Sequence, residues 1–128
     1  MSSNKIIKQN HSLSTKEYNL LLNSGLKYLY EKNYPKAKDV FSKLVILDEN
    51  RYEAFLNLSN VMVLKKNFLD SEKILLNYIN KNNYDIKIIS ALATLYYNIK
   101  EYEKLDILIE KYIHLEDNYL LDYFKSTF

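Results

Sequence analysis

A tripeptide returns along this chain at a constant spacing of 34 residues, as Lys32-Asn33-Tyr34, Lys66-Asn67-Phe68 and Lys100-Glu101-Tyr102. Apolar residues keep the same step at other positions, for example in the sets Leu21, Phe55 and Ile89; Tyr28, Met62 and Tyr96; and Phe41, Leu75 and Ile109. A fixed period of this length is typical of a structural repeat. We therefore expect three similar units in tandem.

Each unit has the pattern of two helices joined by a turn. After the first tripeptide, Ala37, Phe41 and Leu44 recur at the three- and four-residue spacing of one helix face. The chain has one glycine, Gly25, and one proline, Pro35, too few turn residues for an all-β fold. The sequence therefore predicts an all-α fold.

Capping patterns divide the chain into helices. The segments Ser14–Glu17 and Asn50–Glu53 have the spacing of a capping box, which satisfies backbone amides at a helix start. Pro35 suits a first helical turn, and Asn33 or Asn67 can be the N-cap of the helix that follows it. We predict seven helices, over residues 15–31, 34–47, 51–65, 68–81, 85–98, 101–114 and 118–126.

Length and charge narrow the class of protein. With 128 residues, 48% of them apolar, the chain suits one domain with a real core, and it has no apolar run near the roughly 18 residues of a membrane span. The net charge of +2 comes from residues 1–17, so the remainder is neutral, unlike a nucleic-acid binder. Residues 1–8 lack the apolar core of a signal peptide, so we expect a cytoplasmic protein.

The sequence lacks the combinations of residues that a catalytic site requires. Cysteine is absent, and the two histidines, His11 and His114, lie 103 positions apart. No nucleophile-base pair, metal-ligand cluster or glycine-rich loop can be assembled from this sequence. We expect no enzyme activity, no cofactor and no metal.

The units resemble tetratricopeptide repeats, 34-residue helix-turn-helix modules that stack into a right-handed superhelix. With Tyr18 as position 1, family positions 8, 11, 20 and 24 hold Gly25, Tyr28, Ala37 and Phe41. The resemblance implies an α-solenoid of repeats 18–51, 52–85 and 86–119 within a domain of residues 15–128. A flexible N-terminal arm, residues 1–14, would precede it, and the helix at about 118–126 would cap it.

In this family the first helix of each repeat lines a concave groove that binds peptides. The matching positions of unit 1 are Asn19, Leu22, Asn23, Leu26, Leu29 and Tyr30. Those of units 2 and 3 include Leu56, Asn57, Asn60, Val63, Lys87, Thr94 and Tyr97. Apolar and amide side chains together suit a peptide or helix of a partner protein. The same leucines could instead be buried core.

One specialised groove of the family is not expected. Some members hold the terminal carboxylate of chaperone tails with Lys, Asn, Asn, Lys and Arg, and the matching positions are Leu22, Leu26, Asn57, Lys87 and Ala91. Asn57 and Lys87 alone cannot balance a desolvated dicarboxylate, so we predict no such clamp.

The C-terminal segment indicates an alternative function. The C-terminal segment has apolar residues on more than one side of a short helix, and we predict an oligomer or partner contact through Tyr119, Tyr123, Phe124 and Phe128. The leading expectation is a non-catalytic adaptor or small chaperone that binds a partner protein. The alternative is a self-assembling structural protein, such as a homodimer, that uses this aromatic helix.

Overall fold

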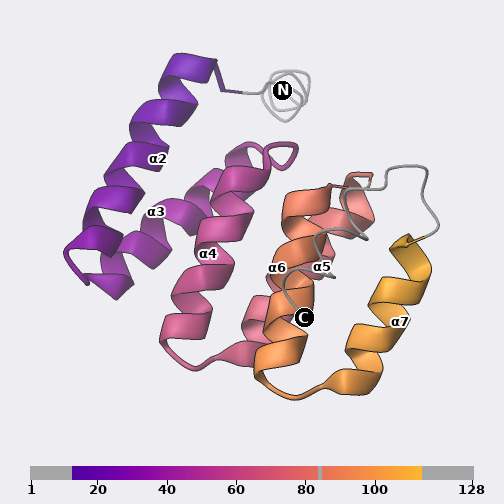
Figure 1. Ribbon diagram of the computed structural model, residues 1–128. Coiled ribbons are helices and arrows are strands. Elements are labelled where there is room, and N and C mark those ends of the chain that lie inside the picture. The colour runs from indigo at the N-terminus through magenta and orange to yellow at the C-terminus, as the bar shows by residue number, and fades with distance from the viewer. Residues whose placement is uncertain (1–12, 84, 114–128) are drawn as a thin grey trace, which may run out of the picture.

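The computed structural model describes residues 13–83 and 85–113, which form six helices and no strand (Figure 1). These are α2 (Thr15–Tyr30), α3 (Tyr34–Leu47), α4 (Tyr52–Leu64), α5 (Phe68–Lys81), α6 (Ile86–Asn98) and α7 (Tyr102–Tyr112). Each lies within two residues of its predicted bounds. The predicted helix at 118–126 and nearly all of the N-terminal arm lie outside the described residues.

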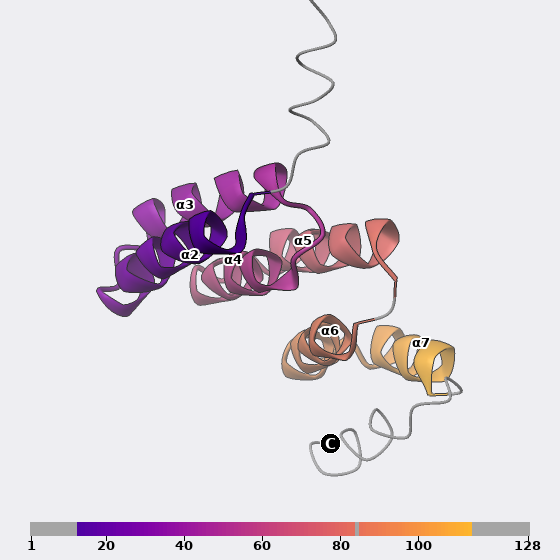
Figure 2. The ribbon, with the colours of Figure 1, turned by 90° about the horizontal axis from the view of Figure 1, so that it is seen from above.

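The helices pack in chain order, each against the next, and form a solenoid-like array. Seen from above, α2, α4 and α6 follow one side of the array, and α3, α5 and α7 follow the other (Figure 2). The second helices begin at Tyr34, Phe68 and Tyr102, at intervals of 34 residues. The expected all-α architecture of stacked helix pairs is therefore confirmed.

The first two helices start as predicted. At α2 the backbone amide of Ser14 donates to Glu17 Oε1 at 2.9 Å, and the amide of Glu17 donates to Ser14 Oγ at 3.1 Å, so both bonds of the capping box are present. At α3 the Asn33 side chain accepts from the amide of Lys36, and Pro35 lies in the first turn.

The predicted capping box at α4 is wrong, whereas Asn67 is the N-cap residue of α5 as predicted but makes no side-chain cap bond. The N-cap of α4 is Arg51, in extended conformation and without a side-chain cap bond, so Asn50 does not close a capping box there. At α5, Asn67 occupies the N-cap position, but its side-chain amide donates to Asp70 Oδ2 at 2.7 Å instead of receiving a backbone bond. Short polar side chains have several local partners, so a cap pattern does not decide between them.

The turn inside each unit explains the recurring tripeptide. Its lysine has a left-handed backbone in all three units, with φ of 61° at Lys32, 60° at Lys66 and 65° at Lys100. The amide of the following residue then donates to a carbonyl five residues back, at 2.8, 2.7 and 2.8 Å. This bond closes the C-terminal end of the first helix. The left-handed residue that such a helix end requires is usually a glycine.

A left-handed lysine predicts a stabilising substitution. Lys66→Gly should raise the free energy of unfolding by about 0.5 kcal/mol, because the strain of a side chain at this φ exceeds the entropy that glycine loses on folding. Urea unfolding would measure it. The control is Lys65→Gly, at the neighbouring φ of −87°, which should lower stability. A fall for both variants would contradict the argument.

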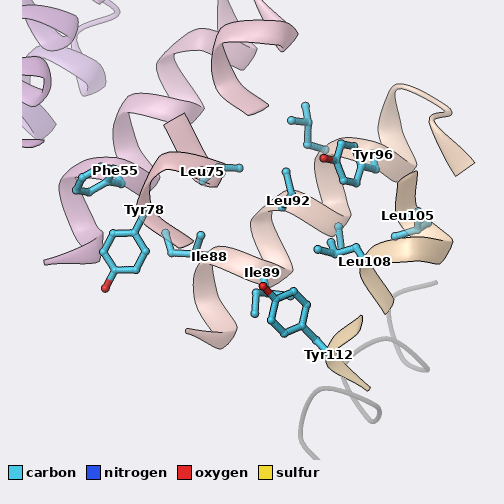
Figure 3. Close-up of a cluster of buried hydrophobic side chains, with 12 residues drawn as sticks. Phe55, Leu75, Tyr78, Ile88, Ile89, Leu92, Tyr96, Leu105, Leu108 and Tyr112 are labelled. Carbon is cyan, nitrogen blue, oxygen red and sulfur yellow. The ribbon is translucent and has the colours of Figure 1, made fainter. Parts of the chain in front are cut away.

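Two clusters of buried side chains fill the array. The N-terminal cluster joins α2, α3 and α4, and the C-terminal cluster joins α4, α5, α6 and α7 (Figure 3). Half-buried Val45 and Ile74 pack against both clusters. The core is therefore continuous along the array, but few side chains join its two clusters.

The helices of the first unit cross closely at Gly25. A Cβ atom built on this residue would lie 2.5 Å from the buried ring of Phe41 on α3. The same two positions hold Ser59 with Leu75 in unit 2. The larger side chain, Phe41, thus faces Gly25, and the smaller Leu75 faces Ser59. The size of the facing side chain accounts for glycine in unit 1.

The junction between the first two units is built around Arg51. Its Nε lies 3.2 Å from Oδ2 of buried Asp48, close enough for an ion pair although not aligned for a hydrogen bond. Its Nη2 donates to the carbonyl of Leu13 at 3.1 Å, and its guanidinium lies 4.7 Å from the ring centroid of Tyr18. One side chain thus joins the start of α2 to the loop before α4.

Candidate functional site

The residues predicted for the groove all lie on α2, α4 and α6, which share one side of the array (Figure 2). We call the surface that they form the α2–α4–α6 face. Its exposed members are Asn19, Asn23, Leu26, Tyr30, Asn60, Val63, Lys87 and Tyr97. Its half-buried members are Leu22, Leu29, Leu56, Asn57 and Thr94. The C-terminal aromatic residues Tyr119, Tyr123, Phe124 and Phe128 lie outside the described residues.

The face is hollowed between α4 and α6 by an open pocket of about 430 Å³, which we call the upper pocket. It is lined by Leu56 of α4 and by Ile86, Lys87, Ser90 and Ala91 of α6. Apolar side chains form most of this lining, and one ammonium group borders it. Leu56 and Lys87 are both residues that the sequence predicted for the groove.

A second pocket of about 200 Å³, the lower pocket, adjoins the first through Ala91. Of the predicted groove residues, Asn60, Val63 and Thr94 line it, and Asn98 adds a further amide. Leu75 and other apolar side chains complete the lining. The two pockets together make a trough along α6 that offers apolar surface and side-chain amides.

The leucines of the first unit divide between the two alternatives. Leu22 and Leu29 are half-buried and pack against the N-terminal cluster, so much of their surface belongs to the core. Leu26 and Tyr30 are exposed. Periodicity places these residues on one side of α2, but the share of each side chain that remains in solvent depends on how closely α3 and α4 approach.

Asn57 and Lys87 have partners of their own. The Asn57 side-chain amide donates to the carbonyl of Glu53 in its own helix at 2.9 Å. Lys87 Nζ donates to Tyr52 Oη at 2.7 Å and lies 4.7 Å from the ring centroid of Tyr52. This hydrogen bond raises the pKa of Lys87. The absence of a carboxylate clamp stays a prediction, since no bound peptide tests it.

The Tyr52–Lys87 contact repeats a contact one unit earlier. Tyr18 Oη donates to Glu53 Oε1 at 3.1 Å and accepts from the amide of Ala54 at 3.1 Å. Burial raises the pKa of Tyr18. In both cases a tyrosine at position 1 binds the residue at position 2 of the next unit. Position 2 therefore serves the junction between units, which the tyrosines at Tyr18 and Tyr52, 34 residues apart, could have indicated.

A polar network that the sequence did not predict borders a pocket of about 260 Å³ formed by α5, α6 and α7. Glu72 of α5 accepts from Tyr96 Oη at 2.6 Å and pairs with Lys104 Nζ at 3.2 Å. Burial, followed by the bond to Glu72, raises the pKa of Tyr96. The network joins α5, α6 and α7, and the 34-residue pattern does not predict these contacts.

Within residues 13–83 and 85–113, no three side chains of His, Asp or Glu converge so as to hold a metal ion. Over the same residues, no helix has both the length and the apolar character needed to cross a membrane.

Neither the family models nor the curated proteins compared with this chain gave a match. The class that the fold defines is an all-α array of stacked helix pairs. Its function has to be inferred from the α2–α4–α6 face itself.

Proposed function

We propose that this chain is a tetratricopeptide-repeat protein that binds a helix or peptide of a partner protein on its α2–α4–α6 face and catalyses no reaction. The observation that carries the proposal is the trough between α4 and α6. Leu56, Asn60, Val63, Lys87 and Thr94 line its two pockets, and each stands at a groove position of the family. The exposed Leu26 of α2 extends the apolar surface beyond the trough.

The trough favours a helical ligand. The upper pocket meets α6 over residues 86–91 and the lower pocket over residues 91–99, so their centres lie roughly 10 Å apart at 1.5 Å per residue. Side chains seven residues apart on a helix have this separation, whereas those on one side of an extended peptide lie about 6.6 or 13 Å apart. An amphipathic helix could thus place one apolar side chain in each pocket.

Polar groups around the trough would set the orientation of such a helix. Asn60, Thr94 and Asn98 border the lower pocket, where their side chains can bond polar residues that flank the buried anchor. A helix with two apolar anchors and an otherwise polar surface is therefore the proposed ligand, in keeping with an adaptor or a small chaperone.

The proposal predicts a loss of binding on Val63→Glu. A carboxylate at this position would enter the lower pocket and oppose apolar burial, so we expect the dissociation constant to rise at least tenfold. The ligand would be identified by affinity capture and mass spectrometry, and its minimal peptide would then be titrated by fluorescence anisotropy.

The matched control is Leu69→Glu, which adds the same charge at an exposed leucine of α5, outside the trough. This variant should bind like the parent protein, and circular dichroism should show equal melting for all three proteins. Full binding by folded Val63→Glu, or equal loss in both variants, would refute the α2–α4–α6 face as the binding site.

A further inference from the structure

One helix of the array has an apolar surface that its counterparts bury. On α2, Leu20 is 62% exposed and Leu21 is 39% exposed. One unit later, Ala54 and Phe55 are 0% and 1% exposed, and two units later the corresponding isoleucines are both fully buried. We call the surface of Leu20 and Leu21 the leading face of α2.

The second helix of the preceding unit contributes to this burial, and Phe55 lies in addition against Tyr78 of its own unit, with ring centroids 5.0 Å apart. Helix α3 packs against α4, and Ala54 shares the N-terminal cluster with Phe41 and Leu44 of α3. Helix α5 packs against α6 in the same way, and Ile89 shares the C-terminal cluster with Leu75. The leading face of α2 therefore leaves exposed the apolar positions that are buried in α4 and α6.

The register of the repeats extends into residues 1–12. Subtracting 34 from the bounds of α3 gives residues 0–13, so this segment corresponds in sequence to the second helix of a preceding unit. Ile6 and Ile7 correspond to Val40 and Phe41 of α3, which are half-buried and fully buried. The segment thus carries its adjacent apolar residues at the positions that face the core in α3.

The chain enters α2 from a fixed point that lies within reach. Leu13 packs against the N-terminal cluster, and its carbonyl accepts from Arg51 at 3.1 Å. Leu20 lies seven residues after Leu13, about 10 Å along α2. Ile6 lies seven residues before Leu13. A segment that turned back at Leu13 would therefore place Ile6 and Ile7 beside the leading face even if it were helical.

We propose that residues 1–12 cover the leading face of α2 in the same chain, with Ile6 and Ile7 against Leu20 and Leu21. The cover is smaller than the contacts between later units. Asn10 and His11 stand where α3 has Leu44 and Val45 and where α5 has Tyr78 and Ile79. The proposed cover is therefore narrow, and its role does not depend on what the α2–α4–α6 face binds.

Introduced cysteines test the contact directly, because the chain has none of its own. Ile7→Cys with Leu21→Cys should form an intramolecular disulfide under mild oxidation, seen as a faster band on a non-reducing gel and assigned by mass spectrometry. The control pair is Ile7→Cys with Asn23→Cys, which lies two residues further along α2 and on the α2–α4–α6 face. We expect it to oxidise at least tenfold more slowly.

Equal rates for the two pairs would overturn the proposal, because a segment without a docking site would reach both positions alike. A disulfide-linked dimer from the Leu21→Cys pair would also overturn it and would assign the leading face to a second copy of the chain.

Hydrogen exchange gives an independent measurement. Ile6→Asp with Ile7→Asp should speed amide exchange in α2 at least tenfold and leave α6 unchanged. The control, Ser2→Asp with Ser3→Asp, adds the same charge outside the apolar pair and should leave α2 protected. Unchanged exchange in α2 of the isoleucine variant would refute the contact.

Discussion

Replacing Gly25 with valine should lower the free energy of unfolding by about 3 kcal/mol, the upper range for overpacked cores. The Cβ atom alone would lie 2.5 Å from the Phe41 ring, and the ring is fully buried between helices, so it has no free space into which to move. Valine adds two methyl groups to this contact. The better helix propensity of a residue with a side chain offsets only about 0.5–1 kcal/mol.

Chemical unfolding monitored by circular dichroism would measure this effect. Ser24→Val is the matched control, since it places the same side chain on an exposed neighbouring position, and it should cost far less. A second test pairs Gly25→Ala with Phe41→Leu. If the clash is the cause, the double variant should be more stable than the two single effects predict. Strictly additive effects would show that the crossing tolerates a side chain.

Replacing Arg51 with methionine should cost about 2–4 kcal/mol. Removing one partner of a buried ion pair leaves the other charge unpaired, and Asp48 is almost wholly buried. The substitution also removes the bond to the Leu13 carbonyl and the contact with the ring of Tyr18. Methionine keeps much of the apolar stem, so the loss reports on the charge and the hydrogen bonds.

The control for Arg51→Met is the double variant Arg51→Met with Asp48→Asn, which removes the stranded charge. It should recover part of the lost stability, because a buried amide costs less than a buried carboxylate. Exposed Lys81 and Glu49 form a comparable surface pair at 3.4 Å, and Lys81→Met should change stability by less than about 1 kcal/mol. Equal losses for Arg51→Met and Lys81→Met would contradict the importance of burial.

The 34-residue period predicted most of this fold because equivalent residues pack in the same way in each unit. Tyr34, Phe68 and Tyr102 begin the three second helices, as the 34-residue step required. The cap at Asn50 was wrong because Arg51 takes the N-cap position in an extended conformation, and its side chain bonds the carbonyl of Leu13, a partner that only the folded junction provides. Tertiary contacts decided the details that local patterns left open.

The candidate site was predictable to a lesser degree. The pattern placed Leu22 and Leu26 on the same helix face, but the packing of α2 against its neighbours turned the first toward the core and left the second exposed. Lys87 was predicted as a groove residue, whereas its bond to Tyr52 depends on the approach of two units. A single repeat carries no sign of such a contact, and only the recurrence of tyrosine at Tyr18 and Tyr52 hinted at it.

The small number of side chains that join the two clusters affects the order in which the helices unfold. Within residues 13–83 and 85–113, half-buried Val45 and Ile74 are the side chains that pack against both clusters. In linear arrays each unit is held by its neighbours alone, so an end can detach while the remainder stays folded. Because α2, α3 and α4 share the N-terminal cluster, we expect their amides to become exposed together at mild denaturant concentrations, in a step separate from the opening of α6 and α7.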